Sequence, residues 1–271
     1  MRIPPWLSEW LNITFRWFHV FAAILWVGST YYFTWLDGRF QEAEREAREG
    51  EAAEVWMVHS GGFYVVNKVK TPGARELHWF RWEALLTWLS GAVLLVLLYY
   101  LGGGMVDVDV RDISNTTAVL FGVGMILAGG LVYDLLVSSP LARNERAFAL
   151  VAYVLIVGLA YLSTRVISGR AAFLHLGATF GTIMVANVWM HILPAQRRMI
   201  AAAKEGRTPD ARDAALAKLR SKHNTFMAVP VVFTMISNHY PVATYGHEYN
   251  WLILSALVLA GFVAAKIIRR A

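Results

Sequence analysis

The sequence contains no cysteine among its 271 residues. This absence excludes disulfide bonds, iron–sulfur clusters and zinc–thiolate sites, and it excludes a covalently attached c-type haem, which requires a C-x-x-C-H motif. Charged residues are also scarce, at 16% of the chain. Any redox cofactor must therefore be held by histidine, methionine or oxygen ligands.

Apolar residues make up 57% of the chain and include 11 tryptophans, more than an ordinary soluble domain of this size carries. Seven stretches are nearly free of charge, and each approaches or exceeds the roughly 17 to 25 residues that a helix needs to cross the hydrocarbon core. These stretches are 17–36, 84–104, 113–133, 147–164, 171–196, 225–245 and 249–265. We therefore expect an all-α integral membrane bundle of about seven transmembrane helices, formed by residues 1–271 as a single domain.

The distribution of lysine and arginine predicts an orientation, because cytoplasmic loops carry an excess of both. Most of the 25 basic residues fall on one side of the expected bundle, largely in two connections at about 37–80 and 197–222. The basic residues on the other side are Arg2, Arg16, Arg111, Arg165 and Arg170. We expect the N-terminus outside and the C-terminus in the cytoplasm, and the net charge of +6 needs no nucleic-acid partner. Within the first connection, the Glu-, Ala- and Arg-rich stretch 41–58 predicts a solvated or interfacial helix.

Six histidines lie at the ends of these apolar segments. An ionisable side chain within a membrane span is costly and indicates a functional site, and imidazole is the commonest metal ligand. A single histidine could be capped or interfacial, but six together favour a haem or metal site. They are His19, His78, His175, His191, His223 and His239.

The spacing of four of these histidines suggests two layers. His175 and His191 are 16 residues apart, as are His223 and His239, which is about 24 Å along a helix. Antiparallel helices would let His175 meet His239 near the outer surface and His191 meet His223 near the inner one. However, 16 residues leave the two histidines of one helix about 160° apart around its axis. Either the kink expected at Pro230 corrects this angle, or His19 and His78 supply the partners.

Histidines on facing helices are typical of a non-covalent b-type haem, which needs axial imidazole, an apolar slot and cations for its propionates. We expect one or two such haems, with His19, His175 and His239 as candidate iron ligands. Copper or zinc is the alternative, but closely spaced ligands of the H-x-x-x-H kind are missing and the abundant Trp and Phe suit a large ring. The candidate propionate partners are Arg16, Arg165 and Arg170.

Glycine spacing indicates one close contact between helices. Gly177 and Gly181 form a G-x-x-x-G pair, which would let a neighbouring backbone or a flat macrocycle approach closely.

Polar residues near the inner histidines suggest a second site. Asn187 precedes His191 by one turn, and Asn224 follows His223. A polar, cationic pocket open to the cytoplasm is one interpretation; asparagines that bond across helices and cations that anchor the interface are the other. The further members of this candidate pocket are Arg197, Gln196, Asn67 and Lys68.

Three stretches resemble known membrane proteins. The sequence FHVFAAILWVG (Phe18 to Gly28) resembles the opening span of small haem-b or copper-associated proteins, including the membrane protoporphyrinogen oxidases and the copper-resistance D proteins. The blocks HLGATFGTIMVANVWMHILPAQRRMI (His175 to Ile200) and SKHNTFMAVPVVFTMISNHYP (Ser221 to Pro241) are similar to the N-terminal membrane domain of the cytochrome-linked urate oxidases, or urate hydroxylases. This second similarity covers nearly the whole chain.

The resemblance implies a multi-pass oxidoreductase of the bacterial inner membrane that converts urate to 5-hydroxyisourate and passes electrons through haem b to a cytochrome c. Combined with the histidine and polar-residue pattern above, this reaction leads us to expect urate binding by Asn187, Asn224 and Arg197, with His191 and His223 as catalytic residues. We expect cofactor binding by His19, His78, His175, His239, Arg16 and Arg170. A further span and a cytochrome c domain commonly follow this region in that family. We expect the acceptor to be such a domain, beyond this sequence, or a separate protein. The alternatives are a haem-b electron carrier, a protoporphyrinogen-oxidase-like enzyme and a copper transporter.

Overall fold

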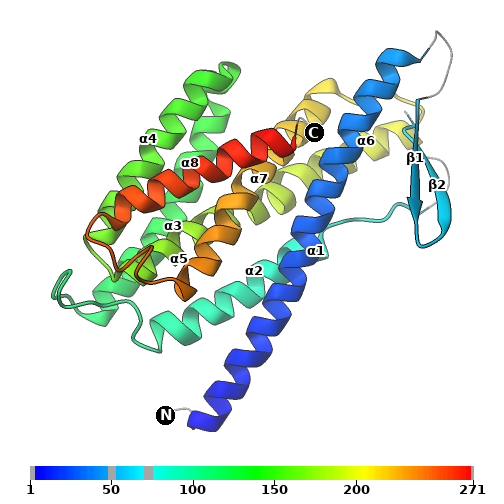
Figure 1. The fold of residues 1–271 in the computed structure, drawn as a ribbon. Helices are drawn as coiled ribbons and strands as arrows, with labels where there is room; N and C mark the ends of the chain where they lie inside the picture. Colours follow the sequence, from blue (N-terminus) through cyan, green and yellow to red (C-terminus); the bar gives the residue numbers. More distant parts are fainter. Residues whose placement is uncertain (1–3, 48–52, 70–75, 270–271) are drawn as a thin grey trace.

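The computed structural model describes residues 4–47, 53–69 and 76–269, and this part of the chain is mainly helical with one small antiparallel sheet (Figure 1). Five basic residues used for the orientation, Arg2, Arg48, Lys70, Arg75 and Arg270, lie outside the described residues. In chain order the elements are α1 (Pro5–Glu46), β1 (Glu54–His59), β2 (Gly62–Asn67), α2 (Trp82–Leu95), α3 (Asn115–Ser138), α4 (Glu145–Thr164), α5 (Gly169–Ala186), α6 (Leu193–Lys204), α7 (Ala211–Ile236) and α8 (Asn250–Ile268). Two π-helical turns, Val96–Tyr100 and Asn187–Ile192, extend α2 and join α5 to α6.

Six helical segments of the described chain are long and apolar enough to cross a membrane. They are α1, α2 with its π-helical end, α3, α4, the continuous segment from α5 to α6, and α8. The predicted span at 225–245 is different, because α7 ends at Ile236 and a 3-10 turn and a loop follow. Several charged residues lie in the first half of α7, so only residues 225–236 form an apolar helical part. At the rise of an α-helix this part is about 18 Å long, shorter than the roughly 30 Å thickness of the hydrocarbon core.

Helix α5 forms the centre of the bundle. In the most apolar window of Gly169–Lys204, 72% of the residues are buried, compared with 6% in α1. Neighbours α2, α3, α4 and α7 all pack against α5. A Cβ at Gly177 would lie 2.1 Å from Oγ1 of Thr234 on α7, whereas no atom lies within 4 Å of one at Gly181. The close helix approach predicted by the glycine pair is thus confirmed at Gly177, and the neighbour there is a helix.

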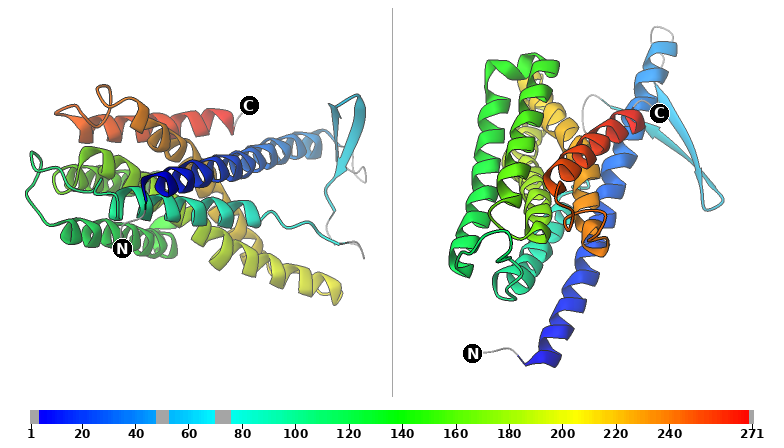
Figure 2. Two further views of the ribbon diagram at one scale, coloured as in Figure 1. Left: turned by 90° about the horizontal axis from the view of Figure 1, so that it is seen from below. Right: turned by 60° about the vertical axis from the view of Figure 1, so that its left-hand side comes forward.

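The outer faces of the bundle carry large apolar side chains. Along α3, Leu120, Leu127, Leu131 and Leu135 are each more than 60% exposed. Helix α1 is a long rod along one side of the bundle, and its N-terminal end extends beyond the other helices (Figures 1 and 2). Continuous apolar surfaces of this kind are rare on soluble monomers.

The first connection contains a β-hairpin, so the helix predicted over 41–58 is wrong at 54–58, where strand β1 lies, and its part at 48–52 lies outside the described residues. Strand β1 pairs with β2 in antiparallel register, with Trp56 opposite Val65. Ser60 and Gly61 form the two-residue turn, and both have positive φ, 49° and 78°, as a type I′ hairpin turn requires. The strands are rich in β-branched and aromatic residues, which favour a pleated surface over a helix. Val55 is buried in a small cluster with residues of α1.

Candidate functional site

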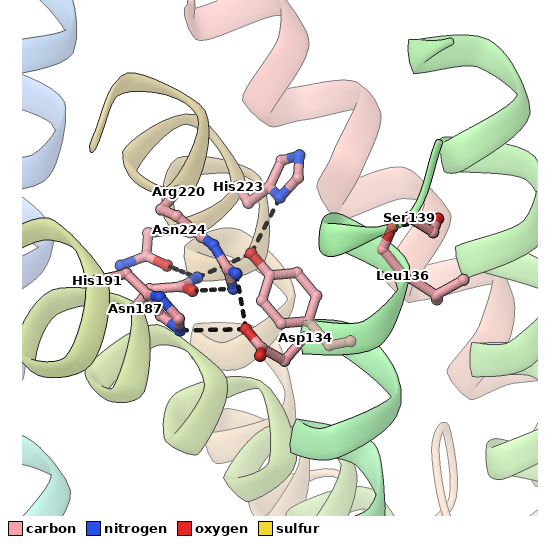
Figure 3. Close-up of polar contacts among 9 residues, drawn as sticks. Asp134, Leu136, Ser139, Asn187, His191, Arg220, His223 and Asn224 are labelled. Carbon is pink, nitrogen blue, oxygen red and sulfur yellow. Dashed lines mark hydrogen bonds and ion pairs between the residues drawn. The ribbon is translucent and has the colours of Figure 1, made fainter. Parts of the chain in front are cut away.

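A buried polar network lies at the end of the bundle where α3 ends and α4 begins (Figure 3). Three segments supply its side chains: α3, the π-helical turn after α5, and α7. We call this set the polar network, and its members are Tyr133, Asp134, Asn187, His191, Arg220, His223 and Asn224.

An ion pair connects α7 to α3. Nη2 of Arg220 donates to Oδ1 of Asp134 at 2.6 Å, and Nε2 of His191 lies 3.1 Å from the same oxygen (Figure 3). The Arg220 side chain is only 3% exposed, whereas that of Asp134 is 46% exposed. A buried guanidinium requires such a partner, because an unpaired buried charge is strongly destabilising. The pair therefore fixes the relative position of α3 and α7 at this end of the bundle.

Asn187 is the hub of the polar network. Its Nδ2 donates to the Tyr133 hydroxyl at 2.9 Å and to Oδ1 of Asn224 at 2.8 Å, and its Oδ1 accepts from Nη1 of Arg220 at 3.1 Å. Nδ2 of Asn224 donates in turn to the carbonyl of Met184 at 3.0 Å. Both asparagines are buried. The amide of Asn187 has used both of its donors, so it holds the neighbouring side chains in place and has no free N–H for a ligand.

His223 occupies the α4 side of the polar network. Its Nδ1 lies 3.0 Å from the Tyr133 hydroxyl, and its ring stacks on Phe148 of α4 with a centroid distance of 5.0 Å. The Tyr133 oxygen already accepts from Asn187, so we assign the Tyr133 O–H as donor to Nδ1. This assignment leaves Nε2 of neutral His223 as the protonated nitrogen.

The π-helical turn Asn187–Ile192 explains how one helix aims two distant histidines at the same neighbour. Such a turn holds one extra residue, which rotates later side chains by about 100° and reduces the expected 160° offset to about 60°. Pro194 follows the turn, and a proline lacks the N–H and clashes with the preceding turn of a regular helix. As a result His175 and His191 both contact α3, at Gly122 and Asp134.

The pairing expected between α5 and α7 is therefore wrong in its details. His191 bonds to Asp134 of α3, and His223 bonds to Tyr133 of α3, so the two histidines are joined through α3 and Arg220. His175 bonds to Tyr100, and within the described chain no contact joins it to His239.

Arg197 and its expected companions lie outside the polar network. Arg197 and Gln196 are exposed on α6, and Gln196 lines a pocket of about 240 Å³ together with His78. Lys68 pairs with Glu44 of α1 at 3.5 Å, and Asn67 ends β2. The cation of the network is Arg220 instead. In the sequence, Arg220 could have been identified by its position one helical turn before Asn224. Asp134 could have been identified as the single charged residue of α3.

Two histidines far along the bundle from the polar network have the geometry of metal ligands. His175 is fully buried, and its Nδ1 lies 2.8 Å from the carbonyl of Ala171. His19 places Nδ1 2.9 Å from the carbonyl of Thr87. A carbonyl oxygen only accepts hydrogen bonds, so Nδ1 is the donor in each ring and Nε2 keeps its lone pair. In metal-binding histidines, one ring nitrogen is likewise held by such a hydrogen bond while the other binds the metal.

The surroundings of His175 and His19 contain close glycines and one basic residue. A Cβ at Gly122 would lie 2.5 Å from Nε2 of His175, and one at Gly91 would lie 2.9 Å from Cε1 of His19. Nε2 of His175 lies 3.2 Å from the Tyr100 hydroxyl. The guanidinium of Arg170 lies over the ring of the neighbouring Tyr99. These residues could hold a planar cofactor through one or two axial imidazoles.

Among the described residues, no hydrogen bond or ion pair joins the other candidate cofactor residues to His19 or His175. His239 is exposed in the 3-10 turn after α7, although its neighbour Asn238 accepts from Nε of Arg170 at 2.8 Å. Arg16 is exposed on α1, and the guanidinium of Arg165 lies over Tyr161. His78 is exposed beside Phe80. Within the described residues no group of three or more His, Asp or Glu side chains is arranged to hold a metal ion.

The fold and the polar network together define a class of protein. It is a helical bundle whose described residues include six segments able to cross a membrane, with a buried charged network near one end and two carbonyl-fixed histidines away from it. A family model described as urate oxidase N-terminal matches residues 5–270. The chain therefore belongs to the urate oxidase N-terminal family. No curated protein and no solved structure matches the chain.

Proposed function

We propose that the protein is a membrane-bound urate oxidase, or urate hydroxylase, that converts urate to 5-hydroxyisourate and passes the electrons to a cytochrome c. The observation that carries this proposal is the family match over residues 5–270. The buried polar network, with its two histidines and one arginine, supports it as a candidate site. The balanced reaction consumes one urate and one water, and it releases two protons and two electrons together with the product.

The membrane setting rests on the exterior of the bundle. Six described segments have the required length and apolar composition, and leucines of α3 lie exposed on the surface. Exposed apolar surface of this extent is favourable in lipid and unfavourable in water. The proposed setting is the bacterial inner membrane, with the C-terminus and the polar network on the cytoplasmic side, as the excess of lysine and arginine there indicates.

The polar network is the proposed urate site. His191 would accept a proton at Nδ1, because its Nε2 faces Asp134, and the carboxylate would stabilise the resulting imidazolium. His223 would serve as a second proton acceptor through Tyr133, whose hydroxyl would take a proton from the substrate as it gives its own to Nδ1. Arg220 replaces Arg197 as the cation of the proposed site, where it pairs with Asp134 and so reduces the repulsion between that carboxylate and an anionic purine.

The asparagines take a supporting role in this proposal. Asn187 is 1% exposed and Asn224 is 5% exposed. Their side chains are bonded to one another and to the backbone of α5, so they position Arg220 and Tyr133 beside the substrate.

Haem b is the proposed cofactor, with His19 and His175 as iron ligands and Arg170 near a propionate. The fit rests on the two carbonyl-fixed Nδ1 atoms, which leave each Nε2 available to iron once the Tyr100 hydroxyl turns away from His175. A haem bound there would supply one-electron redox chemistry between urate and the cytochrome. A haem needs one or two axial ligands, which suits isolated histidines better than a bare copper or zinc ion does.

The experiment measures urate loss and 5-hydroxyisourate formation by membranes containing the protein, with an added electron acceptor. We expect acceptor-dependent turnover that falls by about 100-fold in His191→Ala, since general acid–base catalysis contributes about 10²–10⁴-fold. His59→Ala, at the end of β1 and outside the polar network, is the matched control and should retain full turnover. A purified protein that contains haem but never consumes urate would be an electron carrier, and one that contains copper and no haem would be a copper protein.

A further inference from the structure

Asp134 occupies an unfavourable position for a carboxylate. It is the single charged residue of α3 and lies four residues before that helix ends at Ser138. The C-terminal end of a helix dipole disfavours negative charge, and an ionised group in an apolar helix is costly. Arg220 offsets this cost, and the 46% exposure of the Asp134 side chain keeps the carboxylate partly solvated and accessible from outside the bundle.

The two oxygens of Asp134 are used unequally. Oδ1 takes both Nη2 of Arg220 and Nε2 of His191. Among the described residues, no side-chain or backbone group donates a hydrogen bond to Oδ2. An ionised carboxylate offers about four acceptor sites. One oxygen is thus anchored by two cationic or polar donors, and the other remains an open acceptor on the exposed side.

The groups behind Asp134 hold it in position. Arg220 is fixed from the other side by Oδ1 of Asn187, and Asn187 bonds further to Tyr133 and Asn224. These supporting groups are buried or partly buried, whereas Asp134 and His191 are the more exposed members of the polar network. A ligand that enters this end of the bundle therefore meets the carboxylate and the imidazole first.

We propose that Oδ2 of Asp134 accepts a hydrogen bond from a ring N–H of the substrate and thereby selects planar heterocycles that carry N–H groups beside carbonyls. This inference rests on the proposed function, since urate is the member of that chemical class to be tested. The ion pair with Arg220 is neutral overall, so the carboxylate accepts an N–H with less repulsion of an anionic ring than an unpaired carboxylate would cause. Asp134 is then a residue that determines specificity by direct contact with the substrate.

The test compares wild type and Asp134→Asn on urate and on the four urates that carry a methyl group on one ring nitrogen. Asparagine keeps the shape of aspartate but loses a charged acceptor, and a hydrogen bond to a charged group corresponds to about 10- to 100-fold in kcat/KM. We expect that loss for Asp134→Asn on urate. One of the methylated urates lacks the N–H that Asp134 contacts. For that compound the wild-type kcat/KM should already be about 10- to 100-fold lower than for urate, and Asp134→Asn should lower it by less than a further factor of two.

Asp213→Asn is the matched control, because Asp213 also pairs with an arginine, Arg198, outside the polar network. It should leave all five kcat/KM values within a factor of two. A uniform decrease across all five compounds in Asp134→Asn, or no decrease, would overturn the inference and make Asp134 a structural ion-pair partner. If Asp134→Asn does not fold, Asp134→Glu, which keeps the charge and shifts the oxygen, must change the order of preference among the methylated urates. Wild-type protein that oxidises none of the compounds would refute the proposed function itself.

Discussion

Replacing Asn187 by alanine should destabilise the protein more than any other single asparagine replacement in the described chain. The substitution removes three hydrogen bonds, to the Tyr133 hydroxyl, to Oδ1 of Asn224 and from Nη1 of Arg220. Tyr133 keeps its bond to His223, so two buried groups are left unsatisfied. At about 1–3 kcal/mol for each, the loss is about 2–6 kcal/mol. For a chain of 271 residues that corresponds to a decrease in Tm of roughly 4–10 °C.

The assay is thermal unfolding in detergent, followed by the fluorescence of the 11 tryptophans. Asn67→Ala is the matched control, because Asn67 is exposed at the end of β2 and should change stability by less than about 0.5 kcal/mol. A Tm of Asn187→Ala equal to that of Asn67→Ala would refute the view that Asn187 is the hub of a buried network.

Two further predictions concern the cofactor and the packing of α5. His175→Ala should lower the bound haem by more than half and shift the reduced-minus-oxidised spectrum, because it removes an axial imidazole, whereas His239→Ala should leave both unchanged; equal spectra in the two variants would contradict the ligand assignment. Gly177→Leu should destabilise by about 1–3 kcal/mol, since its side chain would overlap α7. Gly181→Leu has open space around it and should cost less than half as much in the same unfolding assay.

The sequence predicted the helical class well because its apolar segments are long. Five of the seven expected spans fall mainly within long apolar helices whose ends differ by a few residues, and the first lies inside the longer α1. The length of the span at 225–245 was overestimated because average hydropathy over that stretch hides two polar or helix-breaking residues, Asn238 and Pro241. Both follow the end of α7. The hairpin was missed because the predicted helix, which rested on the charged stretch before the hairpin, was continued through β1. The alternating aromatic and β-branched residues of β1 favour a strand instead.

The candidate site was predicted in part. His191, His223, Asn187 and Asn224 do lie together, since helical spacing and antiparallel packing of α5 and α7 bring them to one end of the bundle. Which third helix completes the network could not be read from spacing. The π-helical turn rotates His191 toward α3, and that local change in period is what brings Asp134 into the network.

The most direct test of the proposed reaction mixes the protein, urate and oxidised cytochrome c with oxygen excluded. The reaction predicts two molecules of cytochrome c reduced for each urate consumed, since each cytochrome takes one electron. It also predicts that an oxygen atom from isotopically labelled water appears in 5-hydroxyisourate. No reduction of cytochrome c without oxygen, or urate consumption only when oxygen is present and hydrogen peroxide accumulates, would contradict the account.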